Sequence, residues 1–562
     1  MKKIIISLFF SLIFPSTLLA QDIVVLHTND LHSMFTGTGP DSNAIELEQR
    51  KTLQGHFARL AAVIERERQA AEARGAQVLL VDAGDFYGGT LFQLLGPDSN
   101  RDDVPELDFL HENAYDFVTL GNHEFDAGEA GLLTMLEKSA KKKEHQKTVL
   151  SSTNILLPEQ HPLKKFIKPY HIVETKGGKM LLLGLQGPDA ARVSAPLRDQ
   201  AQFIGFNDQK MKVDWDGLAQ FVQELIDRLK KEEGIKWVTI VMHGGAPEDK
   251  KLVSLLKGVN LFIGGHTHLA YPEVLYHNGA WISQAGCYGQ YLGKLELNFE
   301  KDKLNLLTKN GDHLIAINEQ SPIHLGWSER IKKYQQAVDA KLGAEKPFDD
   351  FLSSTEITRL DSSKIRNPEW AREVMSYVKK EFEQVTKQDL AFYFSSQALV
   401  RSGLEAPEPK TPIFLSDLFR VLPMAAPGDE LYGAQTARFY VTKKDARKLI
   451  RFLFLYRRVS RVFNPVFSDD LTYEVPWIRV PYFYEIKNLR WRNLEYKDWP
   501  ELMPVATNSL VANYFPRLES MTKGLLTLTP RDMEGNELKG IELNGPREVH
   551  LFARGLKHKT DL

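Results

Sequence analysis

The chain has 562 residues, which is too long for one hydrophobic core and predicts two domains. Hydrophobic residues make up 43% and charged residues 26%, a composition typical of a globular, soluble protein and not of a disordered one. The formal net charge of −2 argues against a protein that binds nucleic acid polymers through a large basic surface.

The first twenty residues have the pattern of a secretory signal peptide. Two lysines precede an apolar run, residues 4–19, which ends at Ala20. This run is short for a membrane-spanning helix and ends in a small residue, so we expect cleavage near Ala20 and no membrane anchor. Cys287 is the single cysteine, so no intrachain disulfide forms. We expect a location in the periplasm of a Gram-negative cell or outside the cell; the sequence leaves the oligomeric state open.

Five apolar runs in the first 300 residues predict buried strands, at residues 22–26, 78–81, 116–120, 237–242 and 261–263. Helices are predicted between them, at residues 57–73, 106–113 and 218–231. This alternation predicts an α/β fold with a layered sheet. Polar side chains follow the five strands, and we expect them to converge on one edge of the sheet.

These polar side chains form a candidate metal centre. Any one of them alone would more often be a cap or a hydrogen-bonded polar residue than a ligand. Seven donors are too many for one tetrahedral ion and suit two ions about 3.5–4 Å apart that share a carboxylate. Asp85 follows a glycine that allows a sharp turn, and its two oxygens make it the candidate bridge. The seven donors are Asp30, His32, Asp85, Asn122, His243, His266 and His268.

The second half of the chain predicts a smaller α+β domain. A charged helix at residues 328–342 precedes it, and further helices are predicted at residues 370–385 and 443–457. Short aromatic-rich strands, such as residues 482–484, complete the pattern.

Five segments resemble the motif series of the calcineurin-like metallophosphoesterases: Asp30-Leu31-His32, Gly84-Asp85, Gly121-Asn122-His123-Glu124, His243 and Gly264-Gly265-His266-Thr267-His268. The longer segments 26–32 and 122–126 resemble the 5′-nucleotidase branch of that family. The resemblance implies a layered β-sandwich core flanked by helices. After the signal peptide at 1–20, it also implies a catalytic domain at 21–325, a linker helix at 326–350 and a substrate-binding domain at 351–562.

The resemblance also implies roles for individual residues. One divalent ion, such as Zn or Mn, would bind Asp30, His32, Asp85 and His268. The second would bind Asp85, Asn122, His243 and His266. His123 matches the catalytic histidine of the family, and Asp126 matches the carboxylate that orients it. The implied reaction is hydrolysis of nucleotide phosphate monoesters by metal-activated water.

Substrate recognition is less clearly encoded. Residues 396–403 resemble the Gly-Gly-Ile-Arg segment of the family, with Arg401 in place of its arginine, but both glycines are missing. Leu510 stands where a base-stacking phenylalanine is expected, and it lacks the π surface worth ~1–3 kcal/mol per base. A phosphodiesterase or sugar-nucleotide hydrolase therefore remains an alternative. A non-catalytic binding protein is a third hypothesis, which predicts a lost metal donor or a lost His123, and none is lost.

Overall fold

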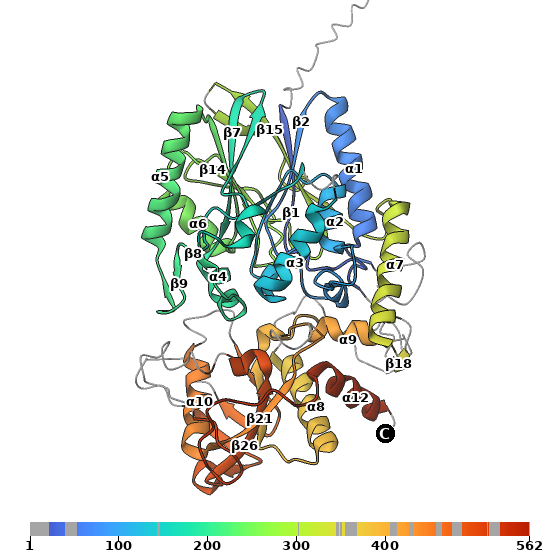
Figure 1. Ribbon diagram of the computed structural model, residues 1–562, viewed down its shortest axis with the longest axis vertical. Helices are drawn as coiled ribbons and strands as arrows, with labels where there is room; N and C mark the ends of the chain where they lie inside the picture. The colour runs from blue at the N-terminus through green and yellow to red at the C-terminus, as the bar shows by residue number, and fades with distance from the viewer. Residues whose placement is uncertain are drawn as a thin grey trace, which may run out of the picture.

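The computed structural model describes residues 22–39, 53–142, 147–301, 303–343, 348, 351–353, 368–404, 413–425, 432–456, 464–474, 486–513, 515 and 529–560. The predicted signal peptide and the predicted strand at 482–484 lie outside these residues. Figure 1 shows the N-terminal part (residues 22–343) above the C-terminal part (residues 368–560).

The N-terminal part contains two large sheets. In the first, four parallel strands lie in chain order, and β15 runs antiparallel beside β1. The four are β1 (Ile23–Thr28), β2 (Gln77–Asp82), β3 (Phe117–Thr119) and β4 (Val149–Ser151). The edge is formed by β15 (Tyr291–Glu300), β16 (Lys303–Leu306) and β17 (Leu314–Ala316).

In the second sheet, β7, β11, β12 and β14 are parallel, and β6 and β13 pair antiparallel at the two edges. Its strands are β6 (His171–Thr175), β7 (Gly178–Gln186), β11 (Trp237–His243), β12 (Leu261–Gly264), β13 (Leu275–His277) and β14 (Ala280–Ser283). A small separate sheet is formed by β5 (Ile155–Leu156), β8 (Gln202–Phe203), β9 (Phe206–Asn207) and β10 (Lys212–Val213).

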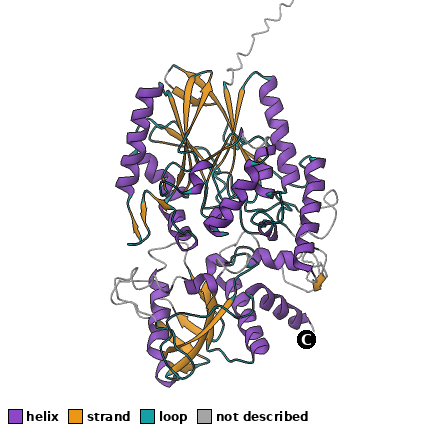
Figure 2. Cartoon of the chain, in the orientation of Figure 1, coloured by secondary structure: helices purple, strands orange, loops and turns teal. Residues whose placement is uncertain are grey.

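The two large sheets pack face to face, with helices on both outer faces (Figure 2). Strand β1 shows why its apolar run is continuous: Ile23 and Val25 pack between the sheets, whereas Val24 and Leu26 pack toward the helices. The first sheet is covered by α1 (Phe57–Ala73), α2 (Pro105–Glu112) and α3 (Gly128–Ala140), and α7 (Leu325–Leu342) packs on the outer side of α1. The second is covered by α5 (Trp215–Glu233) and α6 (Ala246–Leu255), and α4 (Pro188–Ser194) follows β7.

The C-terminal part is built on a four-stranded sheet in the order β21-β26-β19-β22. These strands are β19 (Phe392–Ser396), β21 (Thr436–Thr442), β22 (Pro465–Phe467) and β26 (Leu502–Asn508). Its helices are α8 (Pro368–Thr386), α9 (Leu415–Val421), α10 (Lys443–Tyr456) and α12 (Glu548–Thr560). The remaining strands are β18 (Phe351–Ser353), β20 (Ile413–Phe414), β23 (Leu471–Glu474), β24 (Lys487–Trp491) and β25 (Leu494–Glu495).

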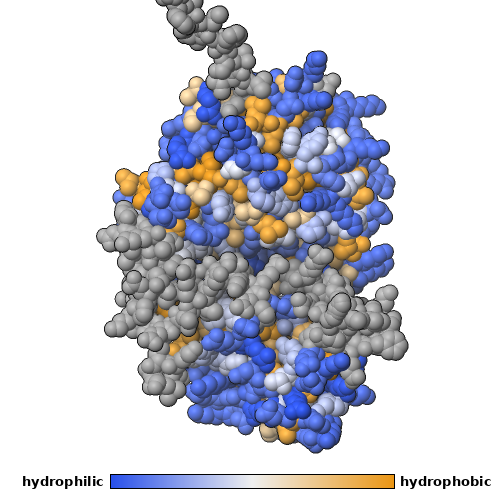
Figure 3. Space-filling view, turned by 180° about the vertical axis from the view of Figure 1, so that it is seen from behind, coloured by the Kyte–Doolittle hydropathy of each residue, from blue (hydrophilic) through white to orange (hydrophobic). Residues whose placement is uncertain are grey.

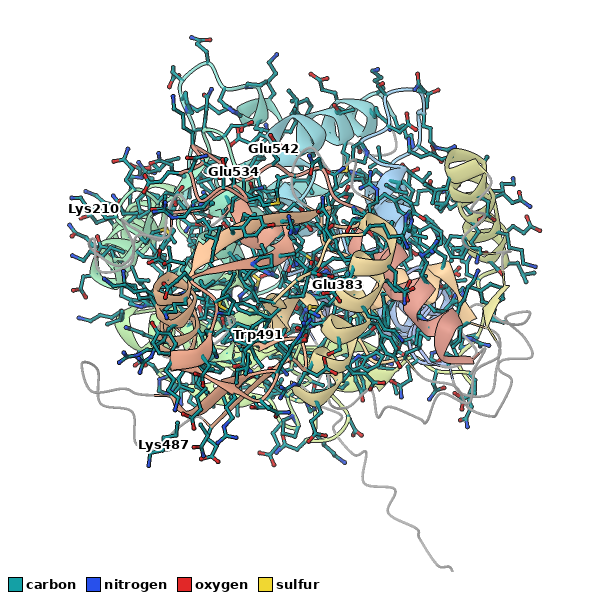
Figure 4. The ribbon with its side chains drawn as sticks, turned by 90° about the horizontal axis from the view of Figure 1, so that it is seen from below. Lys210, Glu383, Lys487, Trp491, Glu534 and Glu542 are labelled. Atoms are coloured by element: carbon teal, nitrogen blue, oxygen red, sulfur yellow. The ribbon has the colours of Figure 1, made fainter. Side chains whose placement is uncertain are left out.

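Figure 4 looks onto the C-terminal part from below, where the labelled Glu383 and Trp491 lie. The Trp491 indole donates a hydrogen bond to the Ala391 carbonyl (2.7 Å), and Glu383 accepts one from the Leu390 backbone (2.7 Å). These bonds fasten β24 and α8 to the segment that leads into β19. Figure 3 shows the face opposite to that of Figure 1: hydrophobic patches lie among hydrophilic residues on the N-terminal part, and the coloured surface of the C-terminal part is mostly hydrophilic.

The predicted fold class is confirmed: a layered α/β sandwich is joined to a smaller α+β part. The expectation of a single sheet edge needs a correction, because the five predicted strands are divided between two facing sheets, three in one and two in the other. Hydrophobic periodicity does not say which sheet a buried strand joins. Within the described ranges, no helix combines the length and the apolar composition needed to cross a bilayer.

Candidate dimetal centre

The seven candidate donors all lie at the carboxyl ends of parallel strands. Asp30 and His32 follow β1, Asp85 follows β2, and Asn122 follows β3 in the first sheet. In the second sheet, His243 ends β11, and His266 and His268 follow β12. Hydrogen bonds join the two sheets at this point, since the His266 backbone N–H donates to both carboxylate oxygens of Asp30 (3.1 and 3.0 Å).

The loops that carry the donors turn sharply. Five donors have a positive φ, which is uncommon for residues other than glycine: Asp30 (52°), His32 (51°), Asp85 (57°), His266 (78°) and His268 (57°). Such conformations cost on the order of 1–3 kcal/mol each and persist only where the surroundings enforce them. Backbone hydrogen bonds from Asp30 to Gly84 and from His32 to Asp85, both 2.9 Å, hold two of these loops together. The strain therefore serves to turn the donors toward one centre.

One group of donors surrounds Asp30. His268 Nε2 lies 3.0 Å from His32 Nε2 and 3.4 Å from Asp30 Oδ1. His32 Nε2 lies 3.9 Å from Asp30 Oδ1 and 3.7 Å from Asp85 Oδ2. Asp30 and His32 are buried. The structure thus brings together the residues predicted for the first ion, with Asp85 at the side toward the second group.

The other group surrounds Asp85. His243 Nε2 lies 2.9 Å from Asp85 Oδ2, 3.2 Å from Asn122 Oδ1 and 3.2 Å from His266 Nδ1. Asp85 therefore lies between the two groups, where a bridging carboxylate must be. All seven predicted donors meet at one place, and their role as ligands remains a proposal.

The outer ring nitrogens of two candidate ligands are hydrogen-bonded in the way that metal binding requires. His32 Nδ1 faces the Gly88 carbonyl (3.2 Å) and His243 Nδ1 faces the Ala83 carbonyl (2.8 Å). Because a carbonyl only accepts, each Nδ1 carries the proton, and in the neutral ring each Nε2 offers a lone pair to the centre. Burial lowers the pKa of His243, but the Asp85 carboxylate outweighs burial and raises this pKa to about 10. Without metal, His243 therefore carries a second proton at neutral pH, which a bound cation would replace. The negative charge that raises this pKa also attracts a cation, so the residues fit a pair of divalent cations.

His123 lies beside the donors but has a different partner. Its Nδ1 is 2.7 Å from Asp126 Oδ2, while its Nε2 is 3.9 Å from Asp85 Oδ2. The Asp126 carboxylate therefore holds the proton on Nδ1 and turns Nε2 toward the centre. Burial raises the pKa of Asp126 despite the neighbouring imidazole. The pair has the geometry of a histidine oriented by a carboxylate.

Several supporting residues have no individual signal in the sequence. Glu124 is fully buried and accepts hydrogen bonds from the backbone N–H groups of Asp85 (3.2 Å), Tyr87 (3.2 Å) and Gly121 (2.5 Å). It thereby ties the loop after β2 to the loop after β3. Asn29 donates to Asp30 Oδ2 (2.6 Å) and accepts from the Ala285 backbone (2.8 Å). Both residues lie within the motif segments quoted above, but their partners Asp85, Tyr87 and Ala285 are distant in sequence.

The C-terminal part contributes Arg401, whose Nη2 lies 3.3 Å from His32 Nε2. The Arg401 backbone N–H donates to the Val421 carbonyl at the end of α9 (2.9 Å). Leu510, by contrast, is only 7% exposed and belongs to a hydrophobic cluster with Ala506 and Val549. The structure therefore brings Arg401 to the centre, whereas Leu510 offers little surface to a substrate.

Comparisons with known proteins agree with this geometry. The family model of the calcineurin-like phosphoesterases matches residues 23–270. The 5′-nucleotidase of Vibrio cholerae is 27% identical over 340 residues, which are 55% of this chain and 54% of that protein. The chain thus spans about half the length of the curated relatives it matches.

Two solved structures share the fold over most of the chain. The 5′-nucleotidase precursor of Thermus thermophilus has a TM-score of 0.71 at 21% identity, covering 96% of each chain. The sulfate thiohydrolase SoxB of the same organism has a TM-score of 0.66 at 16% identity, covering 96% of this chain and 94% of that one. Residues 23–270 therefore match the calcineurin-like phosphoesterase family, and the chain is similar to 5′-nucleotidases in sequence and in fold.

Proposed function

We propose that the protein is a dimetal phosphohydrolase that releases inorganic phosphate from phosphate monoesters, with nucleoside monophosphates as the leading substrate class. The observation that carries this proposal is the convergence of seven metal donors beside an intact His123–Asp126 pair. A non-catalytic binding protein with this fold would need neither the seven donors nor the His123–Asp126 pair, so we reject the hypothesis of a binding protein.

When bound, two divalent cations supply positive charge for the phosphoryl oxygens and activate water for attack. Asp30, His32, Asp85 and His268 would hold one cation, and Asp85, Asn122, His243 and His266 the other. His123 would donate a hydrogen bond or a proton from Nε2 to the phosphoryl or leaving-group oxygen, while Asp126 keeps Nδ1 protonated. Arg401 would bind a phosphate oxygen from the opposite side of the site, since its guanidinium already reaches His32.

Domain limits follow the same proposal: residues 21–325 carry the catalytic centre, residues 326–350 link the parts, and residues 351–562 contact the substrate. Hydrogen bonds between the parts support the proposal that the last part faces the loops around the centre. Arg420 donates to the Gly37 carbonyl (3.1 Å), and Gln93 donates to the Pro423 carbonyl (3.4 Å). Export by a signal peptide remains a prediction from the sequence, which N-terminal sequencing of the mature protein would test.

The burial of Leu510 supports the alternative function of a phosphodiesterase or sugar-nucleotide hydrolase. Leu510 replaces the expected stacking residue and is buried, so recognition of a base lacks its usual support at this position. The decisive experiment compares release of phosphate from AMP with hydrolysis of bis(p-nitrophenyl) phosphate, before and after EDTA treatment and with Mn²⁺ or Zn²⁺ added back. The proposal expects metal-dependent turnover of AMP. Turnover of the diester alone would favour the alternative, and no metal-dependent turnover of either would reject both.

A further inference from the structure

The candidate histidine ligands differ in the group that hydrogen-bonds to the ring nitrogen facing away from the centre. For His32 and His243 it is a backbone carbonyl, of Gly88 and Ala83 respectively. For His266 it is a side-chain carboxylate, because His266 Nε2 lies 3.4 Å from Asp189 Oδ2. A carboxylate on the outer nitrogen of an imidazole fixes its tautomer and makes the inner nitrogen a stronger donor.

Asp189 is itself held in place from three directions. It follows Pro188 in the first turn of α4, and its Oδ1 pairs with the guanidinium of Arg192 one turn later. Its backbone N–H donates to both carboxylate oxygens of Glu248 on α6 (3.2 and 3.3 Å). The preceding Gly187 N–H donates to the carbonyl of His243, which is a candidate ligand (2.8 Å). The segment that carries Asp189 is thus bonded to the end of β11, where His243, another proposed ligand of the second cation, lies.

From this arrangement we propose that Asp189 is a positioning residue for the second metal site: it holds His266 with Nδ1 free for the cation and strengthens binding there. The inference rests on the proposed dimetal function and goes beyond it, since Asp189 belongs to none of the five ligand motifs. His266 Nδ1 lies 3.2 Å from His243 Nε2, on the metal side of the ring, so the Nε2 proton is the one available to Asp189.

The test uses the full chain and measures Co²⁺ binding through its visible absorption, in competition with a chelator. In Asp189→Ala we expect one of the two Co²⁺ equivalents to bind 10- to 100-fold more weakly, with the absorption of that site altered, and the other to bind as in wild type. Asp189→Asn keeps a neutral hydrogen-bond acceptor, so its affinity for this Co²⁺ equivalent should lie between those of wild type and Asp189→Ala. The double variant Asp189→Ala/Arg192→Ala also removes the guanidinium that pairs with Asp189 and should show the same weakening.

A matched control is Asp208→Ala, which likewise removes an aspartate paired with an arginine, here Arg198 (3.0 Å). It should bind both Co²⁺ equivalents as in wild type, and metal-free Asp189→Ala should melt as wild type does. Wild-type affinity for both equivalents in Asp189→Ala would overturn the inference and leave the proposed function intact. Equal weakening of both equivalents together with a lower metal-free melting temperature would assign Asp189 a structural role instead. A wild-type protein that binds no metal would overturn the inference and the proposed function together.

Discussion

At the scale of single residues, we propose that His123 is a proton donor and not a metal ligand; its Nδ1 lies 2.7 Å from Asp126 Oδ2 and its Nε2 lies 3.9 Å from Asp85 Oδ2. The substitution His123→Asn should therefore leave both metal ions bound while kcat falls by roughly 10²- to 10⁴-fold, since a positioned proton donor contributes that much. Metal content by elemental analysis, measured with phosphate release on the same sample, checks this. Parallel loss of metal and turnover would show that His123 is a ligand.

Glu106, which accepts a hydrogen bond from Ser33 next to the candidate ligand His32, provides a test of pH dependence. Burial raises its pKa from 4.5 to about 7, although Ser33 donates a hydrogen bond to Oε1 (2.6 Å). Because the folded state holds this proton more tightly than the unfolded state, the stabilisation is complete below pH 4.5 and is lost as the pH rises through about 7. The loss is on the order of 3 kcal/mol.

The substitution Glu106→Gln removes this titrating group. In EDTA, the melting temperature of wild type should fall more between pH 5 and pH 8 than that of Glu106→Gln. The difference between the two proteins isolates Glu106 from the other buried acids, which both proteins share. Melting curves that shift in parallel over this range would contradict the assigned pKa.

The sequence identifies the donors at this scale because each follows an apolar run directly, and the structure brings all of them together. Residues that act on the donors through hydrogen bonds are harder to predict. Asp189 lies 77 positions before His266, and Glu124 reaches back to the backbone of Asp85 and Tyr87. Such partners depend on how loops meet in space, which neither periodicity nor spacing encodes.

At the scale of elements, the loops after β2 and β3 approach each other very closely. A Cβ atom at Gly121 would lie 2.3 Å from Asp85 Oδ1 and 2.6 Å from the Asp85 backbone nitrogen. The substitution Gly121→Ala should therefore displace Asp85, weaken metal binding and destabilise the fold by on the order of 1–3 kcal/mol. Thermal unfolding with and without metal measures both effects.

Gly540→Ala is the matched control for this prediction, because a Cβ there would meet no heavy atom within 4 Å. It should bind metal as wild type does. If Gly121→Ala bound metal equally well, the close approach of the two loops would not be what holds Asp85 in place.

Local pattern predicts the elements themselves well. The helix expected at 57–73 is α1 (Phe57–Ala73), and the run at 237–242 becomes β11 (Trp237–His243). What pattern does not predict is the partner of each strand. Both β1 and β11 are buried on both faces, and nothing in their apolar runs places them in different sheets.

At the scale of the whole molecule, the C-terminal part reaches the centre through Arg401, which the α9 segment holds by its backbone. The substitution Arg401→Ala should leave metal content unchanged and lower kcat/KM by roughly 10- to 100-fold, the loss expected for a charge-assisted hydrogen bond of about 1.5–3 kcal/mol. Steady-state kinetics with AMP measures this.

Arg401→Lys separates the effect of charge from that of geometry, because lysine keeps the positive charge and lacks the planar guanidinium group. It should recover part of the activity. Unchanged kcat/KM in Arg401→Ala would show that the contact with His32 has no part in substrate binding.

The central claim is that two cations bind on either side of Asp85, and anomalous diffraction from crystals grown with Mn²⁺ tests it most directly. We predict two anomalous peaks, one among Asp30, His32 and His268 and one among Asn122, His243 and His266, with Asp85 between them. A map with no peak there, or with a single peak whose ligands exclude Asp85, would contradict it.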